Sequence, residues 1–188
     1  IPDTPGSKNL SGIMGHLKEM PENVKYIGPL SRFNKFRGQK RYDFAVVLSG
    51  PEPQRTMLEE KLLVTFQNSD KKIVFIRGII GGESITSLNK SLEIINYLTF
   101  KELEEVILSS EIIICRPGYT SIMDLAKLEK KAFFIPTPGQ YEQEYLAERF
   151  MKLGIAPFCK QEKFEISKLE DLRDFSGFSN LNFRSNFG

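Results

Sequence analysis

The fold of this chain is decided by residues 112–143, which read IIICRPGYTSIMDLAKLEKKAFFIPTPGQYEQ. Residues 112–115 form a short apolar run, typical of a strand that is buried on both faces of a sheet. Arg116-Pro117-Gly118 interrupts this run, and a helical pattern begins at Thr120. A second apolar run, residues 132–135, ends in a Pro/Gly loop. Strand, turn, helix and strand in this order predict an α/β domain with a Rossmann-like, doubly wound parallel sheet.

Polar residues collect where the strands of this stretch end and the helices begin. A helix that starts near Gly118 presents unpaired backbone amides and the positive end of its dipole, and both favour a phosphate. Gly118 has no Cβ, so a ligand can approach its backbone closely. Asp124, about one turn into the helix, can accept hydrogen bonds from a ribose diol. These features predict a nucleotide site at the carboxyl ends of the strands. An ordinary turn at Gly118 and a solvated Asp124 remain the alternative.

Two motifs, CRPGYTSIMDLA and PTPGQYEQEYLAE, resemble the donor-binding half of GT-B glycosyltransferases, specifically the MurG-like group that uses UDP-N-acetylhexosamine donors. The family pattern has a C-R-S-G turn, an acidic residue after that glycine, and a P-x-x-x-x-x-x-Q-Q loop and helix. Gly118 matches the glycine, Asp124 replaces the more usual Glu, and Gln143 matches the first glutamine. Glu144 stands in place of the second glutamine, which leaves the donor sugar open. The resemblance covers roughly residues 43–158.

The resemblance implies the C-terminal half of a GT-B fold with a site for a UDP-sugar. In that site the residues from Gly118 to Ser121 would address the phosphates, Asp124 the ribose, and Gln143 with Glu144 the sugar. The full set of implied donor-binding residues is Ser49, Gly50, Leu98, Gly118, Tyr119, Thr120, Ser121, Asp124, Gln140, Gln143 and Glu144. Leu98 would contact the uracil edge through its backbone, and Ser49 and Gly50 would contact the diphosphate or the sugar. No cofactor is expected, and no metal either, because the sequence has no Asp-x-Asp motif or His/Cys cluster.

The same resemblance divides the chain into a linker or crossover segment at residues 1–42, a donor-binding domain at residues 43–174 and a C-terminal tail at residues 175–188. The Pro- and Gly-containing stretch at Ile1 predicts a linker, with a processed or tagged N-terminus as the alternative. The resemblance favours truncation, because GT-B enzymes have two Rossmann-like domains. A separate N-terminal domain would hold the acceptor and the catalytic base, so the fragment alone is expected to be inactive. MurG-like enzymes often use lipid-linked acceptors at the cytoplasmic face of the membrane. A UDP-sugar hydrolase, an epimerase and a stand-alone nucleotide-sugar-binding subunit remain alternatives.

Length and composition fit one globular domain of 188 residues. A net charge of +2 gives no strong attraction to nucleic acid, and no nucleic-acid partner is expected. Cys115 and Cys159 are too few for a disulfide framework, and Cys115 is predicted to be a core thiol in a reducing compartment. No apolar run approaches the ~20 residues that a membrane span needs. No signal peptide is visible, and a cytoplasmic location is expected.

Periodicity and capping signals predict the remaining elements. A turn with Ser49 and Gly50 follows the first strand, and Gly78, Gly81 and Gly82 predict a flexible loop. Capping boxes begin at Thr99 and Ser167. The predicted strands are residues 44–48, 73–76 and 92–95. The predicted helices include one from about Pro53 to Phe66 and those at residues 99–108, 142–153 and 167–175.

The two ends of the chain have weaker signals. Residues 24–27 are a short strand candidate, and His16 is predicted to lie on the surface instead of acting as a catalytic base. Basic residues interleaved with Phe33 and Phe36 predict a solvated linker, with a phosphate or membrane contact as the alternative. The tail has four phenylalanines and no clear periodicity. It would pack either on a second domain or on the surface of this one.

Overall fold

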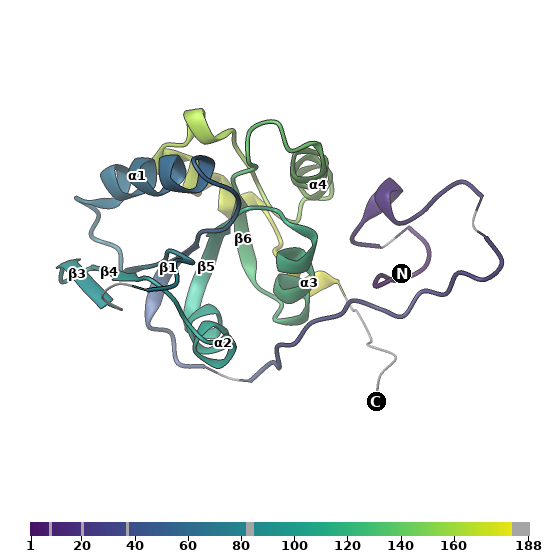
Figure 1. Cartoon of the computed structure of the whole chain (residues 1–188), viewed down its shortest axis with the longest axis horizontal. Helices are drawn as coiled ribbons and strands as arrows, with labels where there is room; N and C mark the ends of the chain where they lie inside the picture. The colour runs from purple at the N-terminus through teal and green to yellow at the C-terminus, as the bar shows by residue number, and fades with distance from the viewer. Residues whose placement is uncertain (8, 20, 37, 82–84, 182–188) are drawn as a thin grey trace.

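The computed structural model describes residues 1–7, 9–19, 21–36, 38–81 and 85–181. Figure 1 shows a central sheet with helices on both faces and an N-terminal segment that extends past α3 and α4. Within the described residues, no helix is long and apolar enough to cross a membrane. The strands are β1 (Tyr42–Val47), β2 (Ile73–Ile76), β3 (Ile85–Asn89), β4 (Leu92–Ile95), β5 (Ser110–Cys115) and β6 (Lys131–Phe134). The α-helices are α1 (Gln54–Phe66), α2 (Phe100–Ser109), α3 (Tyr119–Lys127) and α4 (Tyr141–Lys152). The 3-10 helices are η1 (Gly12–Met14), η2 (Gln161–Lys163), η3 (Ile166–Asp174) and η4 (Phe178–Asn180).

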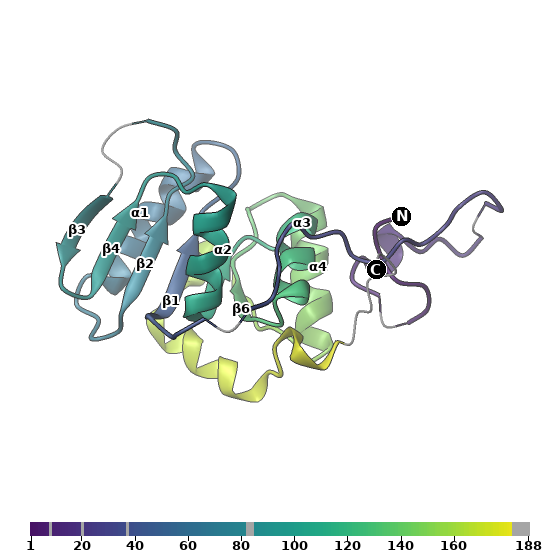
Figure 2. The same ribbon diagram turned by 90° about the horizontal axis from the view of Figure 1, so that it is seen from below.

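The sheet has the strand order β3-β4-β2-β1-β5-β6. β1 pairs in parallel with β2 and β5, β2 with β4, and β5 with β6. β3 lies at one edge, antiparallel to β4, and Figure 2 shows it on the side of the sheet away from α3 and α4. The register places Val47 beside Cys115, so β1 and β5 end at the same level. The predicted doubly wound parallel sheet is therefore confirmed for five strands.

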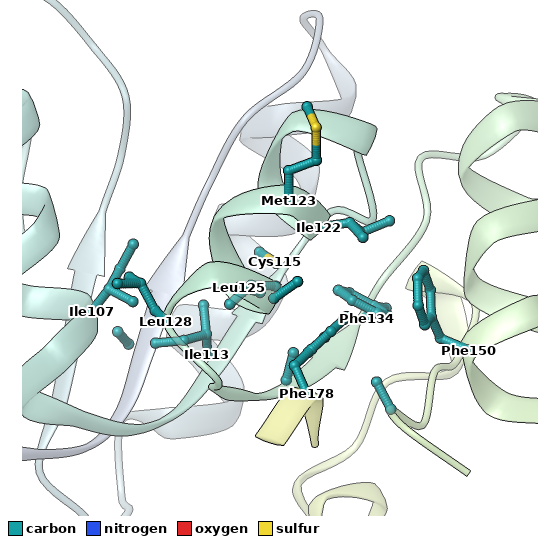
Figure 3. Close-up of a cluster of buried hydrophobic side chains, with 14 of the residues drawn as sticks. Ile107, Ile113, Cys115, Ile122, Met123, Leu125, Leu128, Phe134, Phe150 and Phe178 are labelled. Atoms are coloured by element: carbon teal, nitrogen blue, oxygen red, sulfur yellow. The ribbon is translucent and has the colours of Figure 1, made fainter. Parts of the chain in front are cut away.

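Side chains alternate along the parallel strands between two apolar layers, because successive residues of a strand point to opposite faces. Ile113 and Phe134 belong to the layer under α2, α3 and α4. Ile114 and Phe133 belong to the opposite layer, under α1 and η3. Figure 3 shows the first layer, in which Leu125 of α3 packs over the sheet. Burial on both faces explains why the strands read as continuous apolar runs.

Most elements lie where the sequence predicts them. The strands predicted at residues 73–76 and 92–95 coincide with β2 and β4. Thr99 caps α2 in a complete capping box with Glu102, also as predicted.

Cys115 is a buried free thiol, and burial raises its pKa to about 12. Gly154, with a φ of 65°, ends α4 in the left-handed conformation.

One strand was missed and two local predictions are wrong. The missed strand is β3, in which ITSLN at residues 85–89 pairs with β4 through its backbone, with a register shift after Ser87. The loop predicted from Gly78 and Gly81 has no regular secondary structure over residues 77–81. Gly82 itself lies outside the described residues. The helix predicted from Ser167 is the 3-10 helix η3, which has no side-chain cap. Its buried residues Leu169 and Leu172 are three apart, as the tighter 3-10 repeat requires. Residues 24–27 form no strand.

The N-terminal segment is folded around the buried carboxylate of Asp3. Asp3 accepts hydrogen bonds from the Leu10 amide at 2.9 Å and the Ser11 amide at 2.8 Å. The segment is attached to α4, since Arg149 donates to the Asn9 carbonyl at 2.8 Å. The N-terminal segment therefore contacts the α/β domain through Asn9.

His16 lies within this segment and is partly buried, with 18% of its side chain exposed. Its ring stacks on Tyr26 with a centroid distance of 4.6 Å. Its Nε2 lies 2.9 Å from the Thr4 carbonyl oxygen. The sequence could not indicate these contacts, because they depend on how an irregular segment folds back on itself.

Candidate functional site

The candidate site lies where the strand order reverses. From β1 the sheet extends through β2 and β4 on one side, and β5 and β6 follow on the other side of β1. In open α/β sheets, ligands bind in the crevice outside the carboxyl ends of the strands at such a switch point. The loop after β1 contains Ser49 and Gly50, and the loop after β5 contains Gly118. Both predicted loops therefore border the same crevice.

The start of α3 is open to a ligand. Gly118 is the N-cap residue, has φ −72° and ψ 145°, and makes no side-chain capping bond. The first intrahelical bond runs from the Ile122 amide to the Gly118 carbonyl at 3.0 Å. The amides of Tyr119, Thr120 and Ser121 thus have no partner within the helix. A Cβ on Gly118 would meet only the Ser121 Oγ, at 3.9 Å. This geometry suits an anion at the positive end of the helix dipole.

Gly50 brings the loop after β1 close to the loop after β6. Its φ of 106° is a conformation that residues with a side chain rarely adopt. A Cβ on Gly50 would lie 3.6 Å from the Thr137 Oγ1. Thr137 is buried, and its Oγ1 has no hydrogen-bond partner. The two loops therefore meet at an unpaired hydroxyl beside a glycine.

The structure brings the predicted sugar-binding residues together around the loop after β6. Gln143 accepts a hydrogen bond from the Thr137 amide at 2.8 Å and donates to the Gln140 side chain. Glu144 accepts from the Gly139 amide at 3.3 Å. The three side chains thus shape the loop through hydrogen bonds within the chain. Glu144 and Gly139 also line a hollow of about 280 Å³ between α4 and η2.

Asp124 lies on the side of α3 that faces residues 31 and 32. Its carboxylate accepts a hydrogen bond from the Ser31 hydroxyl at 2.6 Å. Burial raises the pKa of this carboxyl, although the Ser31 hydrogen bond and the charge of Arg32 oppose the shift. One of its oxygen atoms is thus engaged within the chain, and binding of a ribose by Asp124 stays a prediction.

The remaining predicted residues occupy different positions around the crevice. Tyr119 donates its hydroxyl to the Pro2 carbonyl at 2.9 Å, which leaves its backbone amide as the group for a phosphate. Thr120 and Ser49 are exposed. Leu98 is half-buried in the loop between β4 and α2, packed against the apolar layer. Leu98 is thus at the carboxyl edge of the sheet, as a backbone contact to a base would require.

Arg116 is a site feature that the residue-by-residue predictions missed. It directly follows β5, is 1% exposed and donates to the carbonyl oxygens of Ile135 and Pro136, both at 2.9 Å. It also donates to the Gln54 carbonyl at 3.1 Å and the Gln161 side chain at 2.6 Å. Arg116 therefore joins the exit of β6, the start of α1 and η2. A charged residue next to the apolar run of β5 was the available signal.

Comparison with known protein families matches residues 47–174 to the family described as glycosyltransferase family 28 C-terminal domain. A search of curated protein sequences gave no match. The fold is similar to that of solved glycosyltransferases at low sequence identity. MurG of Acinetobacter baumannii matches with a TM-score of 0.61 and 16% identity, over 89% of this chain and 54% of that protein.

Two further solved structures share the fold. The calicheamicin glycosyltransferase CalG4 matches with a TM-score of 0.60 and 14% identity, over 86% of this chain and 42% of that protein. The glycosyltransferase SnogD from Streptomyces nogalater matches with a TM-score of 0.52 and 16% identity, over 87% and 40%. The chain thus spans about half the length of these proteins, or less.

Proposed function

The chain belongs to the glycosyltransferase family 28 C-terminal domain family, and from this premise we propose that it binds the nucleotide-sugar donor of a GT-B glycosyltransferase. The donor in this proposal is a UDP-N-acetylhexosamine. The observation that carries it is the open N-terminus of α3 at the switch point of the sheet, where Gly118 leaves three amides accessible. Such an N-terminus is an anion-binding site by its backbone alone.

The same geometry suits the chemistry of glycosyl transfer. The bond that breaks joins the anomeric carbon of the sugar to the diphosphate, and the leaving diphosphate gains negative charge. Backbone amides and a helix dipole already aimed at that position stabilise the developing charge without rearrangement. The transfer would then need no bound metal. The phosphate contacts are Gly118, Tyr119, Thr120 and Ser121, through backbone amides or hydroxyls.

Asp124 would hold the ribose, Leu98 the uracil edge, and Gln143 with Glu144 the sugar. The acceptor and the catalytic base would belong to an N-terminal domain of the same protein. In this proposal the acceptor is lipid-linked and the enzyme works at the cytoplasmic face of the membrane. The chain alone would bind the donor without turning it over.

Calorimetric titration with UDP, GDP, dTDP and UDP-N-acetylglucosamine, with and without magnesium, tests this proposal. We expect uridine-selective binding with equal affinity in magnesium and in EDTA. Binding that appears only with magnesium would contradict the metal-free site. Equal affinity for all bases would contradict the assignment of the uracil contact. Release of UDP from UDP-N-acetylglucosamine in water alone would favour the hydrolase.

Asp124→Ala is expected to weaken UDP binding by about 1–3 kcal/mol, because charge-assisted hydrogen bonds to the ribose are lost. Since burial raises the pKa of Asp124, the affinity of the unmodified protein should also fall at acidic pH, as the carboxyl takes up a proton. The variant should lack this part of the pH dependence. Calorimetry across pH measures both effects.

Ser31→Ala is the matched control, because it removes the partner of Asp124 within the chain and keeps the carboxylate. It should bind UDP at least as well as the unmodified protein. Unchanged UDP affinity in Asp124→Ala would remove Asp124 from the site. A loss of affinity in Ser31→Ala as large as that in Asp124→Ala would instead indicate that the pair positions the segment before β1.

A further inference from the structure

Arg116 carries a buried positive charge that the described part of the chain does not neutralise. Its four hydrogen-bond acceptors are three backbone carbonyls and one side-chain amide, all of them uncharged. Its Nε has no partner. Arg55, also buried, is the contrast, because it pairs with the carboxylates of Glu52 and Glu59 at 2.6 Å each. Arg116 therefore differs from Arg55 in having no carboxylate partner for its buried charge.

Burial of an ion without a counter-ion is costly, and the protein normally avoids it by pairing or by loss of the charge. Burial lowers the pKa of Arg116 to about 10, so the guanidinium is still charged at neutral pH. The side chain is also firmly held, because its contacts reach β6, α1 and η2 at once. A fixed, uncompensated cation favours an anion nearby.

The second observation is the unpaired hydroxyl of Thr137. Thr137 is 2% exposed, and its Oγ1 has no hydrogen-bond partner. The Oγ1 atom lies 3.6 Å from the point that a Cβ on residue 50 would occupy. The backbone amide of Thr137 donates to the Gln143 side chain, and the carbonyl of the preceding residue, Pro136, accepts a hydrogen bond from Arg116. The position of Thr137 is therefore fixed from both sides. A buried hydroxyl without a partner is destabilising, and a ligand oxygen over Gly50 would satisfy it.

We propose that the diphosphate of the donor supplies both missing partners, with the Thr137 hydroxyl donating to it and Arg116 acting as its fixed counter-charge. Arg116 is a positioning residue in this inference, since it acts through the loops that it joins and through its charge. Thr137 contacts the ligand. The inference rests on the proposed function, because it names the residues that recognise the phosphates in addition to the α3 amides.

The test measures the affinities of UDP, uridine and pyrophosphate by calorimetry. Arg116→Gln keeps hydrogen-bonding capacity and removes the charge, so it should lower UDP and pyrophosphate affinity by about 10- to 100-fold and leave uridine affinity unchanged. Arg116→Lys should retain most of the UDP affinity because the charge remains. Thr137→Val, which replaces only the hydroxyl, should lower UDP affinity by about 10-fold, and Thr137→Ser should restore it.

Lys130→Gln is the matched control. Lys130 is another partly buried cation that donates to carbonyl oxygens, those of Leu108 and Ser110, but it lies at the amino end of β6. Loss of its charge should change neither UDP nor uridine affinity. A purely structural role of Arg116 would lower uridine and UDP affinity equally and would overturn the inference. So would Thr137→Val binding UDP as well as the unmodified protein.

The outcome for the unmodified protein separates this inference from the proposed function. Binding of pyrophosphate without any preference for UDP would refute the donor site and leave the role of Arg116 and Thr137 standing. Binding of neither would refute both. Should Arg116→Gln fail to fold, Arg116→Lys and the two Thr137 variants carry the test, because lysine keeps the charge of Arg116, valine keeps the volume of Thr137 and serine keeps its hydroxyl.

Discussion

Gly118→Val is expected to abolish binding of UDP and pyrophosphate while the protein stays folded. The backbone at Gly118 has φ −72° and ψ 145°, which a β-branched residue adopts readily. A Cβ there would meet only the Ser121 Oγ at 3.9 Å, so a residue with a Cβ is accommodated at this position. In the complex, however, the valine methyls would occupy the space directly over the amides that begin α3. We expect a loss of affinity of at least about 100-fold, since contact with the amides and the dipole is lost together.

Calorimetry gives the affinities, and urea or thermal unfolding gives the free energy of unfolding. We expect Gly118→Val to change that free energy by less than about 1 kcal/mol. Gly118→Ala is the graded control and should retain part of the UDP affinity, because one methyl group fills less of the space. Large destabilisation by valine would instead assign Gly118 to an ordinary structural turn. Unchanged affinity in a stable variant would move the phosphates away from α3.

The sequence alone predicts the parts of the fold that local patterns determine. The apolar runs at residues 73–76 and 112–115 are buried on both faces, so no alternation was needed to recognise them. The capping box at Thr99 is equally local. β3 was missed because an edge strand is specified by its partner β4, and its own sequence ITSLN does not alternate between apolar and polar residues. η3 is a 3-10 helix in which Leu169 and Leu172 are buried, and the local sequence did not indicate this form.

The residues of the candidate site also fall into those that a local motif indicates and those that only long-range contacts bring together. The family-like motif identifies Gly118 because the glycine and the helix start are adjacent in the chain. The role of Thr137 depends on its distance to Gly50, a contact across two loops far apart in the sequence. The engagement of Asp124 by Ser31 is likewise a long-range contact, over 93 residues. Residues that approach one another only through the sheet topology cannot be paired from one sequence.

Phe178→Ala, in the C-terminal tail, is expected to lower the free energy of unfolding of the domain by about 3–5 kcal/mol. Phe178 is fully buried, although it follows a stretch with no clear periodicity. Its ring centroid lies 5.2 Å from that of Phe150 in α4 and 6.4 Å from that of Phe134 in β6. Figure 3 shows the three rings beside one another. The backbone is fixed as well, because the Phe178 amide donates to the Lys130 carbonyl at 3.1 Å. Removal of the ring would leave a cavity between α4 and the sheet.

Thermal unfolding should show a midpoint lower by roughly 6–20 °C for a domain of this size. Phe36→Ala is the matched control, because Phe36 is 47% exposed and its loss should cost less than about 1 kcal/mol. Equal stability of the two variants would mean that the tail does not pack on the domain in solution.

Phe178 is also connected to the proposed sugar-binding residues through α4. This helix carries Gln143 and Glu144 on its first turn, and Phe178 packs against its buried residue Phe150. A tail that stabilises α4 in this way also holds the proposed sugar-binding loop, so Phe178→Ala should weaken UDP-N-acetylglucosamine binding more than UDP binding.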